Sequence, residues 1–192
     1  GGSAMSADLS HFFRGMGVPI YEGYGLTETC AAACVNNADG NKIGTVGRPL
    51  PGQAAKIAED GEILIRGPVV FDGYHGMPKA SAEAMEDDFF RTGDIGSLDE
   101  HGYLRITGRK KDLIVTAGGK NVSPGPMEDI LRGHPLISQA MVVGDGKPFV
   151  GVLLTLDPDI LKRWKLDHNI PENRSMRELA TDPTLRAELQ DA

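Results

Sequence analysis

The sequence predicts an α+β protein with a β-rich first half and a small α+β second half. Between about residues 43 and 107, short runs of alternating polarity are separated by glycine-containing turns, which is typical of antiparallel hairpins. The composition changes at Arg109-Lys110-Lys111-Asp112, where basic residues gather. Beyond this point strand-like and helix-like segments alternate, and the tail is helical in pattern.

In the first half, residues 6–16 predict a short helix, and residues 18–25 predict a strand that runs into a glycine-rich turn. Residues 27–34 predict a short helix or an extended alanine-rich segment, in which Cys30 and Cys34 are expected to be two small buried side chains on one helical face. Hairpins are expected over 55–66, around Asp60-Gly61, and over 96–107, with a short helix over 78–86 between them. The dense glycines and short strands predict a small β-barrel or sandwich.

In the second half, the sequence predicts a strand over 113–116, a turn at Gly118-Gly119 and a helix over 126–132. A hairpin is expected from 138–143 and 149–156. Helices are then expected over 160–166 and from Ser175 on, with Pro183 in the first turn of the last helix.

The composition excludes several classes of protein. Lys plus Arg is 20 and Asp plus Glu is 27, which gives a net charge of −7. Nucleic-acid binding needs an excess of basic residues, so we expect no nucleic-acid partner. No apolar run approaches the roughly 20 residues of a transmembrane helix, and no signal-peptide pattern opens the sequence. With only two cysteines and scattered histidines, we expect neither a disulfide nor a Cys/His metal site, and a cytoplasmic location.

Tyr24-Gly25-Leu26-Thr27-Glu28 is the first string that suggests chemistry. The glycine would let the backbone approach a ligand, and the Thr27 hydroxyl could donate to a phosphate oxygen. The Glu28 carboxylate is a hard oxygen ligand suited to Mg²⁺, and Tyr24 offers a flat face to a base. Taken alone, the string fits an ordinary turn with a helix cap better than a ligand site.

Two further strings carry candidate ligand-binding residues. In Arg91-Thr92-Gly93-Asp94, the aspartate could accept hydrogen bonds from two vicinal hydroxyls, as a ribose presents them, or could simply bond its own turn. In Gly108-Arg109-Lys110-Lys111-Asp112, the planar guanidinium of Arg109 suits a phosphate or ribose oxygen. The alternative for the second string is a solvated charge cluster at a domain boundary.

Taken together, YGLTE, RTGD and GRKKDLIVTAGGKNVSP, in this order and with these gaps, resemble the adenylate-forming (AMP-binding) superfamily of acyl-CoA synthetases, peptide-synthetase adenylation domains and luciferases. The likeness covers nearly the whole chain. It implies that residues 1–109 are the C-terminal part of the large AMP-binding domain and residues 110–192 the start of a small, mobile C-terminal domain. Residues 1–5 resemble the loop that lies beside the adenine upstream of YGLTE.

The resemblance implies a role for each candidate residue. Thr27 would contact the AMP phosphate, and Glu28 would hold Mg²⁺. Gly23 and Tyr24 would line the adenine pocket, with Tyr24 against the base, and Gly25 would also bind the nucleotide. Asp94 would bind both ribose hydroxyls, supported by Arg109. Lys111 would be the hinge of the small domain, and Gly118 and Gly119 would approach the pantetheine of CoA.

A closer resemblance is to actinobacterial long-chain fatty acid–CoA ligases, on GGKNVSP and on HPLISQ followed by VVGD, although many superfamily members carry Glu where this chain has Lys120. The implied substrates are a fatty acid, ATP and CoA, and a peripheral membrane contact of the parent stays open. Neither the family's phosphate-gripping Ser/Thr/Gly-rich loop nor its catalytic C-terminal lysine occurs in the sequence, so we expect this chain alone to be inactive. The alternatives are a fatty acyl-AMP ligase or adenylation domain, and a non-catalytic nucleotide-binding fragment.

Overall fold

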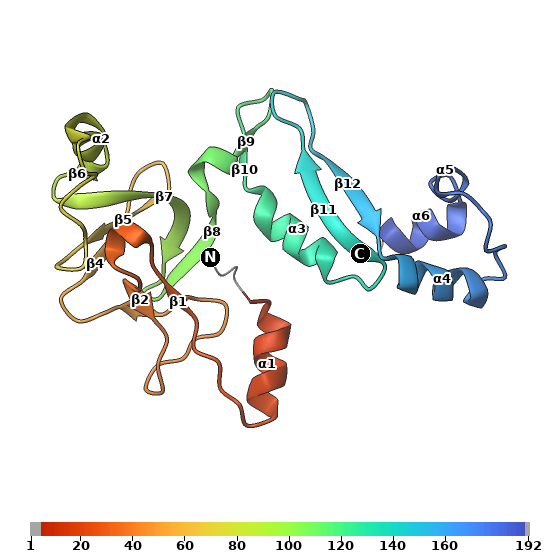
Figure 1. Cartoon of the computed structure of the whole chain (residues 1–192), viewed down its shortest axis with the longest axis horizontal. Helices are drawn as coiled ribbons and strands as arrows, with labels where there is room; N and C mark the ends of the chain where they lie inside the picture. The colour runs from red at the N-terminus through yellow and green to blue at the C-terminus, as the bar shows by residue number, and fades with distance from the viewer. Residues whose placement is uncertain (1–4, 191–192) are drawn as a thin grey trace. The chain divides into compact units, whose positions relative to one another are not determined.

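The computed structural model describes residues 5–190 and separates into two compact units, one that extends to Asp112 and one that begins at Leu113 (Figure 1). The division lies three residues beyond the boundary expected from the sequence. The first unit contains α1 (Ala7–Gly15), β1 (Gly23–Tyr24), the 3-10 turn η1 (Thr27–Thr29), β2 (Cys34–Val35), β3 (Arg48–Pro49), β4 (Ala54–Ile57), β5 (Glu62–Arg66), α2 (Pro78–Glu83), β6 (Met85–Glu86), β7 (Phe89–Leu98), β8 (Leu104–Arg109) and the 3-10 turn η2 (Lys110–Asp112).

Two antiparallel sheets share one core in the first unit. The smaller has the order β1-β2-β3, with Tyr24 opposite Cys34. In the larger sheet β7 pairs with β5, with β6 and with β8, and β4 forms an edge beside β5. The core contains side chains from both sheets: Tyr24, Ala33, Cys34, Val46, Ile63, Ile65 and Leu104. The α+β class is therefore confirmed, whereas the choice between a barrel and a sandwich stays a prediction.

Both expected hairpins form. Ala54 lies opposite Arg66 and Ile57 opposite Ile63 across β4 and β5, and Leu98 lies opposite Leu104 across β7 and β8. The expected helix over 78–86 ends at Glu83, because the next residues pair with β7 as β6. The expected strand over 18–25 is reduced to Gly23–Tyr24.

A bulge interrupts β7 at residues 92–94. Glu62 of β5 pairs with Ile95, and Leu64, two residues further along β5, pairs with Arg91. Arg91 and Ile95 are four residues apart in β7, so β7 contains two extra residues here. Gly93 has φ = 70°, a value that favours glycine. Residues 91–94 therefore do not form a separate turn: they lie inside the ten-residue strand β7, which the bulge distorts at Thr92, Gly93 and Asp94.

The expectation that both cysteines are buried on one helical face is also wrong. The helical segment is one 3-10 turn, Thr27–Thr29, because Cys30 and Ala31 have left-handed φ values of 49° and 94°. Cys30 is exposed, while Cys34 lies in β2 and is fully buried. Burial raises the pKa of the Cys34 thiol to about 12, so this cysteine stays an inert thiol at neutral pH.

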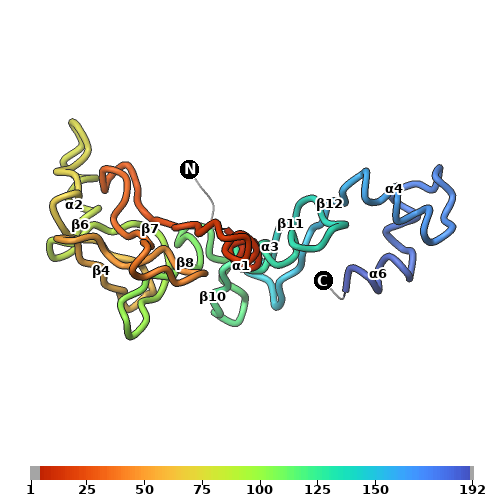
Figure 2. Tube along the Cα trace, turned by 90° about the horizontal axis from the view of Figure 1, so that it is seen from below, coloured from red at the N-terminus to blue at the C-terminus, as the bar shows by residue number. Residues whose placement is uncertain are grey.

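The second unit contains β9 (Ile114–Val115), β10 (Asn121–Val122), α3 (Pro124–Arg132), β11 (Ile137–Val143), β12 (Gly151–Leu156), α4 (Pro158–Asp167), α5 (Met176–Leu179) and α6 (Pro183–Gln190). β11 and β12 form the expected hairpin, and α3 packs along β11 (Figures 1 and 2). The expected helices form, and Pro183 opens α6 as predicted.

The core of the second unit consists of Leu136, Leu161, Trp164, Leu179 and Leu185. The pairing of β9 with β10 was not expected from the sequence. None of the helices within residues 5–190 has both the length and the apolar character that a bilayer crossing requires.

Candidate functional site

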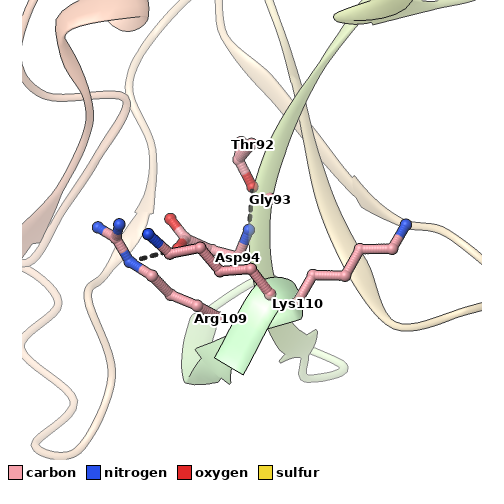
Figure 3. Close-up of a pocket in the computed structure, with 6 residues that line it drawn as sticks. Thr92, Gly93, Asp94, Arg109 and Lys110 are labelled. Carbon is pink, nitrogen blue, oxygen red and sulfur yellow. Dashed lines mark hydrogen bonds and ion pairs between the residues drawn. The ribbon is translucent and has the colours of Figure 1, made fainter. Parts of the chain in front are cut away.

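A cavity of about 410 Å³ lies in the first unit, where the bulge of β7 meets the end of β8 (Figure 3). Its lining residues are Thr92, Gly93, Asp94, Arg109, Lys110 and Lys111. All six lie in the strings RTGD and GRKKD, which thus meet in one place, and three of them, Asp94, Arg109 and Lys111, are predicted site residues. The antiparallel register explains this, because Asp94 and Arg109 are direct partners across β7 and β8.

The carboxylate of Asp94 is the buried charge of this cavity. Asp94 is 5% exposed. Its Oδ2 accepts a hydrogen bond of 2.6 Å from the Tyr24 hydroxyl, and its Oδ1 lies 3.4 Å from Nε of Arg109. Figure 3 shows the Arg109 and Asp94 side chains facing each other. An ionised carboxylate has about four lone-pair sites, so Asp94 can accept further hydroxyl donors from a ligand.

Tyr24 contacts Asp94 directly, which the sequence analysis did not predict. Its ring is part of the core and the residue is 8% exposed, while its hydroxyl reaches the carboxylate. Burial raises the pKa of the Tyr24 phenol, and the hydrogen bond to Asp94 raises it further, so the hydroxyl stays a donor. Stacking of Tyr24 against a base stays a prediction.

Thr27 and Glu28 lie in η1 and are not among the residues that line the cavity. The Glu28 carboxylate accepts a hydrogen bond of 3.1 Å from the Tyr74 hydroxyl, and its backbone carbonyl accepts one of 2.8 Å from the Phe71 amide. Burial and the contact with Glu28 raise the pKa of Tyr74. Sequence analysis did not identify Tyr74, which lies more than forty residues from Glu28 along the chain.

The residues around Glu28 fit a magnesium ion that is shared with a substrate. Within residues 5–190, no group of three His, Cys, Asp or Glu side chains could hold a metal ion. Glu28 therefore offers a single carboxylate, of which Oε1 is engaged by Tyr74. Mg²⁺ commonly binds through one or two carboxylates together with waters and phosphate oxygens of a substrate, which is the arrangement that these residues allow.

A network of charged side chains that the sequence analysis did not identify lies behind the bulge. Glu62 is 3% exposed and accepts hydrogen bonds from Arg91, from Lys110 and from the Gly93 amide. Burial alone would raise the pKa of Glu62, but these three donors outweigh it and the pKa is lowered. The available signal was a glutamate at the start of an apolar strand, Glu62-Ile63-Leu64-Ile65, which is an uncommon position for an unpaired charge.

Comparison with known proteins identifies the family. Residues 1–75 match the family described as "AMP-binding enzyme", and residues 111–173 match "AMP-binding enzyme C-terminal domain". The two matches occur in the order of the resembling motifs, and between them lie RTGD and all the cavity residues except Lys111, which is the first residue of the second match. The chain belongs to the AMP-binding enzyme family.

Relatives within this family include a long-chain fatty acid–CoA ligase of Mycobacterium bovis, FadD15. It is 54% identical over 192 residues, which are all of this chain and 32% of that protein. The chain thus spans about a third of the length of this curated relative.

Two solved structures of O-succinylbenzoate CoA synthetase (MenE) from Bacillus subtilis are similar. The complex with ATP and a magnesium ion has a TM-score of 0.72 at 31% identity, over 81% of this chain and 35% of that one. The AMP complex has a TM-score of 0.73 at 29% identity, over 100% of this chain and 45% of that one.

The glycines of the AMP-binding segment have a structural role that the sequence did not show. A Cβ on Gly25 would lie 1.4 Å from the Ala31 carbonyl oxygen, and one on Gly23 would lie 3.2 Å from that of Cys34. At Gly25, glycine is therefore required by the close approach of the chain's own backbone. The expectation that Gly25 also lets the backbone approach a ligand stays a prediction.

The remaining predicted residues are exposed. Lys111 lies in η2. Gly118 and Gly119 form the turn between β9 and β10, where the Gly119 amide donates to the Thr116 carbonyl at 2.8 Å. A Cβ on either glycine would meet nothing within 4 Å. Their roles as hinge and pantetheine contact stay predictions. Residues 1–4, which include most of the expected adenine-side loop, lie outside the described residues.

Proposed function

We propose that this chain is the part of an AMP-forming long-chain fatty acid–CoA ligase that binds the ribose and part of the phosphate of ATP. The observation that carries the proposal is the buried Asp94 carboxylate, held by Tyr24 and Arg109 beside an open cavity. The 54% identity to a mycobacterial long-chain fatty acid–CoA ligase supports the choice of substrate class. The bound AMP and ATP in the similar MenE structures support a nucleotide as the ligand.

In this proposal Asp94 accepts hydrogen bonds from both ribose hydroxyls, and Arg109 supports the ribose and the phosphate. Thr27 donates to the α-phosphate, while Gly23, Tyr24 and Gly25 form the adenine side. Magnesium bound by Glu28 and phosphate oxygens would offset the negative charge that repels an incoming carboxylate. The described Tyr24–Asp94 contact favours a role in which the phenol fixes the carboxylate before the nucleotide arrives.

The proposed reaction has two steps. A carboxylate oxygen of the fatty acid attacks the α-phosphorus of ATP, and the bond from this phosphorus to the bridging oxygen breaks, which releases pyrophosphate. The thiol of CoA then loses its proton to water and attacks the acyl carbon, and the bond to the AMP oxygen breaks. Activation is needed because a carboxylate is a poor electrophile, whereas AMP is a good leaving group. Arg109 stabilises charge on the phosphate throughout.

Lys111 would act as the hinge about which the second unit turns between the two steps, and Gly118 and Gly119 would then admit the thin pantetheine chain. Residues that grip the terminal phosphates of ATP, the catalytic lysine and most of the fatty-acid tunnel would be supplied by other parts of the full-length enzyme. We therefore propose that these 192 residues alone do not form acyl-CoA.

A product assay by mass spectrometry tests the proposal. The full-length enzyme is given ATP, Mg²⁺, palmitate and CoA, and is compared with the 192-residue chain, with Asp94→Ala and with Asp99→Ala as a matched control. Asp99 also lies in the β7–β8 hairpin region but pairs with Lys42, away from the cavity. We expect palmitoyl-CoA from the wild type and from Asp99→Ala only. Palmitoyl-AMP without thioester would instead indicate an acyl-AMP ligase, and the role of Gly118 and Gly119 would be withdrawn.

A further inference from the structure

Glu62 is the most heavily engaged carboxylate among the described residues. Its Oε2 accepts from Arg91 at 2.8 and 3.2 Å and from Lys110 at 2.9 Å. Its Oε1 accepts from the Gly93 amide at 2.9 Å. Two basic side chains and one amide therefore meet on a side chain that is 4% exposed. A buried carboxylate without such partners would strongly destabilise the fold. The Glu62 carboxylate therefore keeps its three donor groups close to one another.

These donors belong to the two strings that form the nucleotide site. Gly93 immediately precedes Asp94 in the bulge, and Thr92 is fixed on the same side, because its hydroxyl donates to the Ile63 carbonyl at 2.7 Å. Lys110 lies between Arg109 and Lys111, and it also reaches Asp60 at 2.6 Å. Two neighbouring residues of β5, Glu62 and Ile63, therefore bind the bulge, and Glu62 also binds the start of η2.

We propose that Glu62 is a positioning residue of the nucleotide site, which holds the ribose-binding bulge at Gly93 and the residue before the hinge, Lys110, on one buried carboxylate. The inference rests on the proposed function. The contact between Lys110 and Glu62 keeps Arg109 opposite Asp94 while the chain turns at Lys111. Movement at the hinge then begins after Lys110, and the ribose contacts do not move with the second unit.

The pKa values agree with a permanently charged anchor. Hydrogen bonds to Asp60 and Glu62 raise the pKa of Lys110, and the pKa of Glu62 is lowered, so both partners stay ionised around neutral pH. Charge-assisted hydrogen bonds of this kind are about twice as strong as neutral ones. The anchor therefore needs no change of protonation during the reaction.

Lys110→Met tests the inference, because it removes the ammonium but keeps the length of the side chain. Lys110→Arg restores a cation. Lys42→Met is the matched control, since Lys42 also forms a 2.6 Å ion pair, with Asp99, and its side chain is 46% exposed against 39% for Lys110. AMP binding to the full-length enzyme is measured by calorimetry. Adenylate formation, by pyrophosphate exchange, and thioester formation from added palmitoyl-AMP are measured separately.

We expect Lys110→Met to weaken AMP binding about ten-fold and to raise the KM for ATP by a similar factor, with a smaller change in kcat. Lys110→Arg should recover to within about three-fold of the wild type. AMP binding by Lys110→Met that equals that of Lys42→Met would overturn the inference and leave the proposed function intact. A wild-type enzyme that binds no AMP would overturn the proposed function itself. A loss in Lys110→Met that Lys110→Arg does not recover would also contradict an electrostatic anchor.

Discussion

Tyr24→Phe removes the hydroxyl that Asp94 accepts and leaves the rest of the side chain in place. The ring packs in the core of the first unit with Ala33, Cys34 and Ile63, and a phenylalanine keeps these apolar contacts. The change therefore isolates a single hydrogen bond of 2.6 Å to a buried carboxylate. The only atom removed is the oxygen that donates to Asp94, so the change leaves the carbon atoms of the ring in the core.

The expected loss follows from the type of bond. A hydrogen bond to a charged group contributes about 1.5–3 kcal/mol to the free energy of unfolding. Asp94 lines a cavity of about 410 Å³, in which water can replace the phenol as donor, so the loss should lie toward the lower end of that range. We expect the first unit to lose about 1.5–2 kcal/mol.

The assay has to separate the two units. The single tryptophan, Trp164, lies in the core of the second unit, so its fluorescence reports that unit during urea unfolding. Amide hydrogen exchange of peptides that cover β5 and β7, followed by mass spectrometry at each urea concentration, reports the first unit. Tyr24→Phe should lower the stability of the first unit and leave the Trp164 transition unchanged.

Tyr103→Phe is the control. Tyr103 is also buried, at 9% exposed, but within residues 5–190 its hydroxyl makes no hydrogen bond, and its ring lies under Arg48 and Lys42. We expect less than about 0.5 kcal/mol from this change. Equal losses of stability in the two variants would show that the hydrogen bond to Asp94 contributes nothing specific. The structure proposed for the ribose site around Asp94 would then be wrong.

Three other predictions concern separate parts of the first unit. Gly25→Ala should lower the free energy of unfolding by more than about 3 kcal/mol, because its Cβ would overlap the Ala31 carbonyl. Gly15→Ala, in open space in α1, should not destabilise, and urea unfolding of both variants checks this. Acidification should destabilise the unit, because the pKa of Glu62 is lowered from 4.5 in the folded state. Its contribution to stability is complete above about pH 5 and is lost as the pH falls through the folded pKa. A pH series in which stability stayed flat below about pH 5 would contradict the network. Glu28→Gln should raise the Mg²⁺ concentration for half-maximal adenylate formation in the full-length enzyme about ten-fold. Glu83→Gln, which changes an exposed carboxylate 3.8 Å from Lys79, should leave it unchanged. An unchanged Mg²⁺ requirement in Glu28→Gln would exclude Glu28 as a ligand.

Local signals in the sequence were sufficient for the elements that depend on neighbouring residues. The hairpin around Asp60-Gly61 formed as expected, because Gly61 adopts φ = 86° and its amide closes the turn on Ala58 at 2.9 Å. Pro183 began a helix for a similar reason, since its fixed φ suits the first turn.

Elements that depend on distant partners could not be predicted in this way. Residues 91–94 have a turn-like composition, but pairing with Glu62 and Leu64 draws them into β7 and makes the bulge. Cys30 and Cys34 have helical spacing, but Gly25 brings the backbone of Ala31 so close that the helix cannot continue. Strand pairing decides the first case, and a close backbone contact between Gly25 and Ala31 decides the second.

The site shows the same division. The strings around Asp94 and Arg109 were identified from residue type and spacing, and the register of β7 and β8 explains why they meet. Glu62 and Tyr74 were missed because their partners, Gly93 and Glu28, are 31 and 46 residues away in sequence. Neither residue lies in a string with recognisable chemistry, so only the folded chain reveals them.

Transfer of heavy oxygen from the fatty acid to AMP tests the proposed function most directly. Palmitate labelled with heavy oxygen at both carboxylate positions is incubated with the full-length enzyme, ATP, Mg²⁺ and CoA, and the AMP is analysed by mass spectrometry. Because the carboxylate oxygen that attacks the α-phosphorus stays on phosphorus when the thiol displaces AMP, every AMP released with palmitoyl-CoA should carry one labelled oxygen. Unlabelled AMP, or ADP as the nucleotide product, would contradict an acyl-adenylate and with it the roles proposed for Asp94 and Arg109.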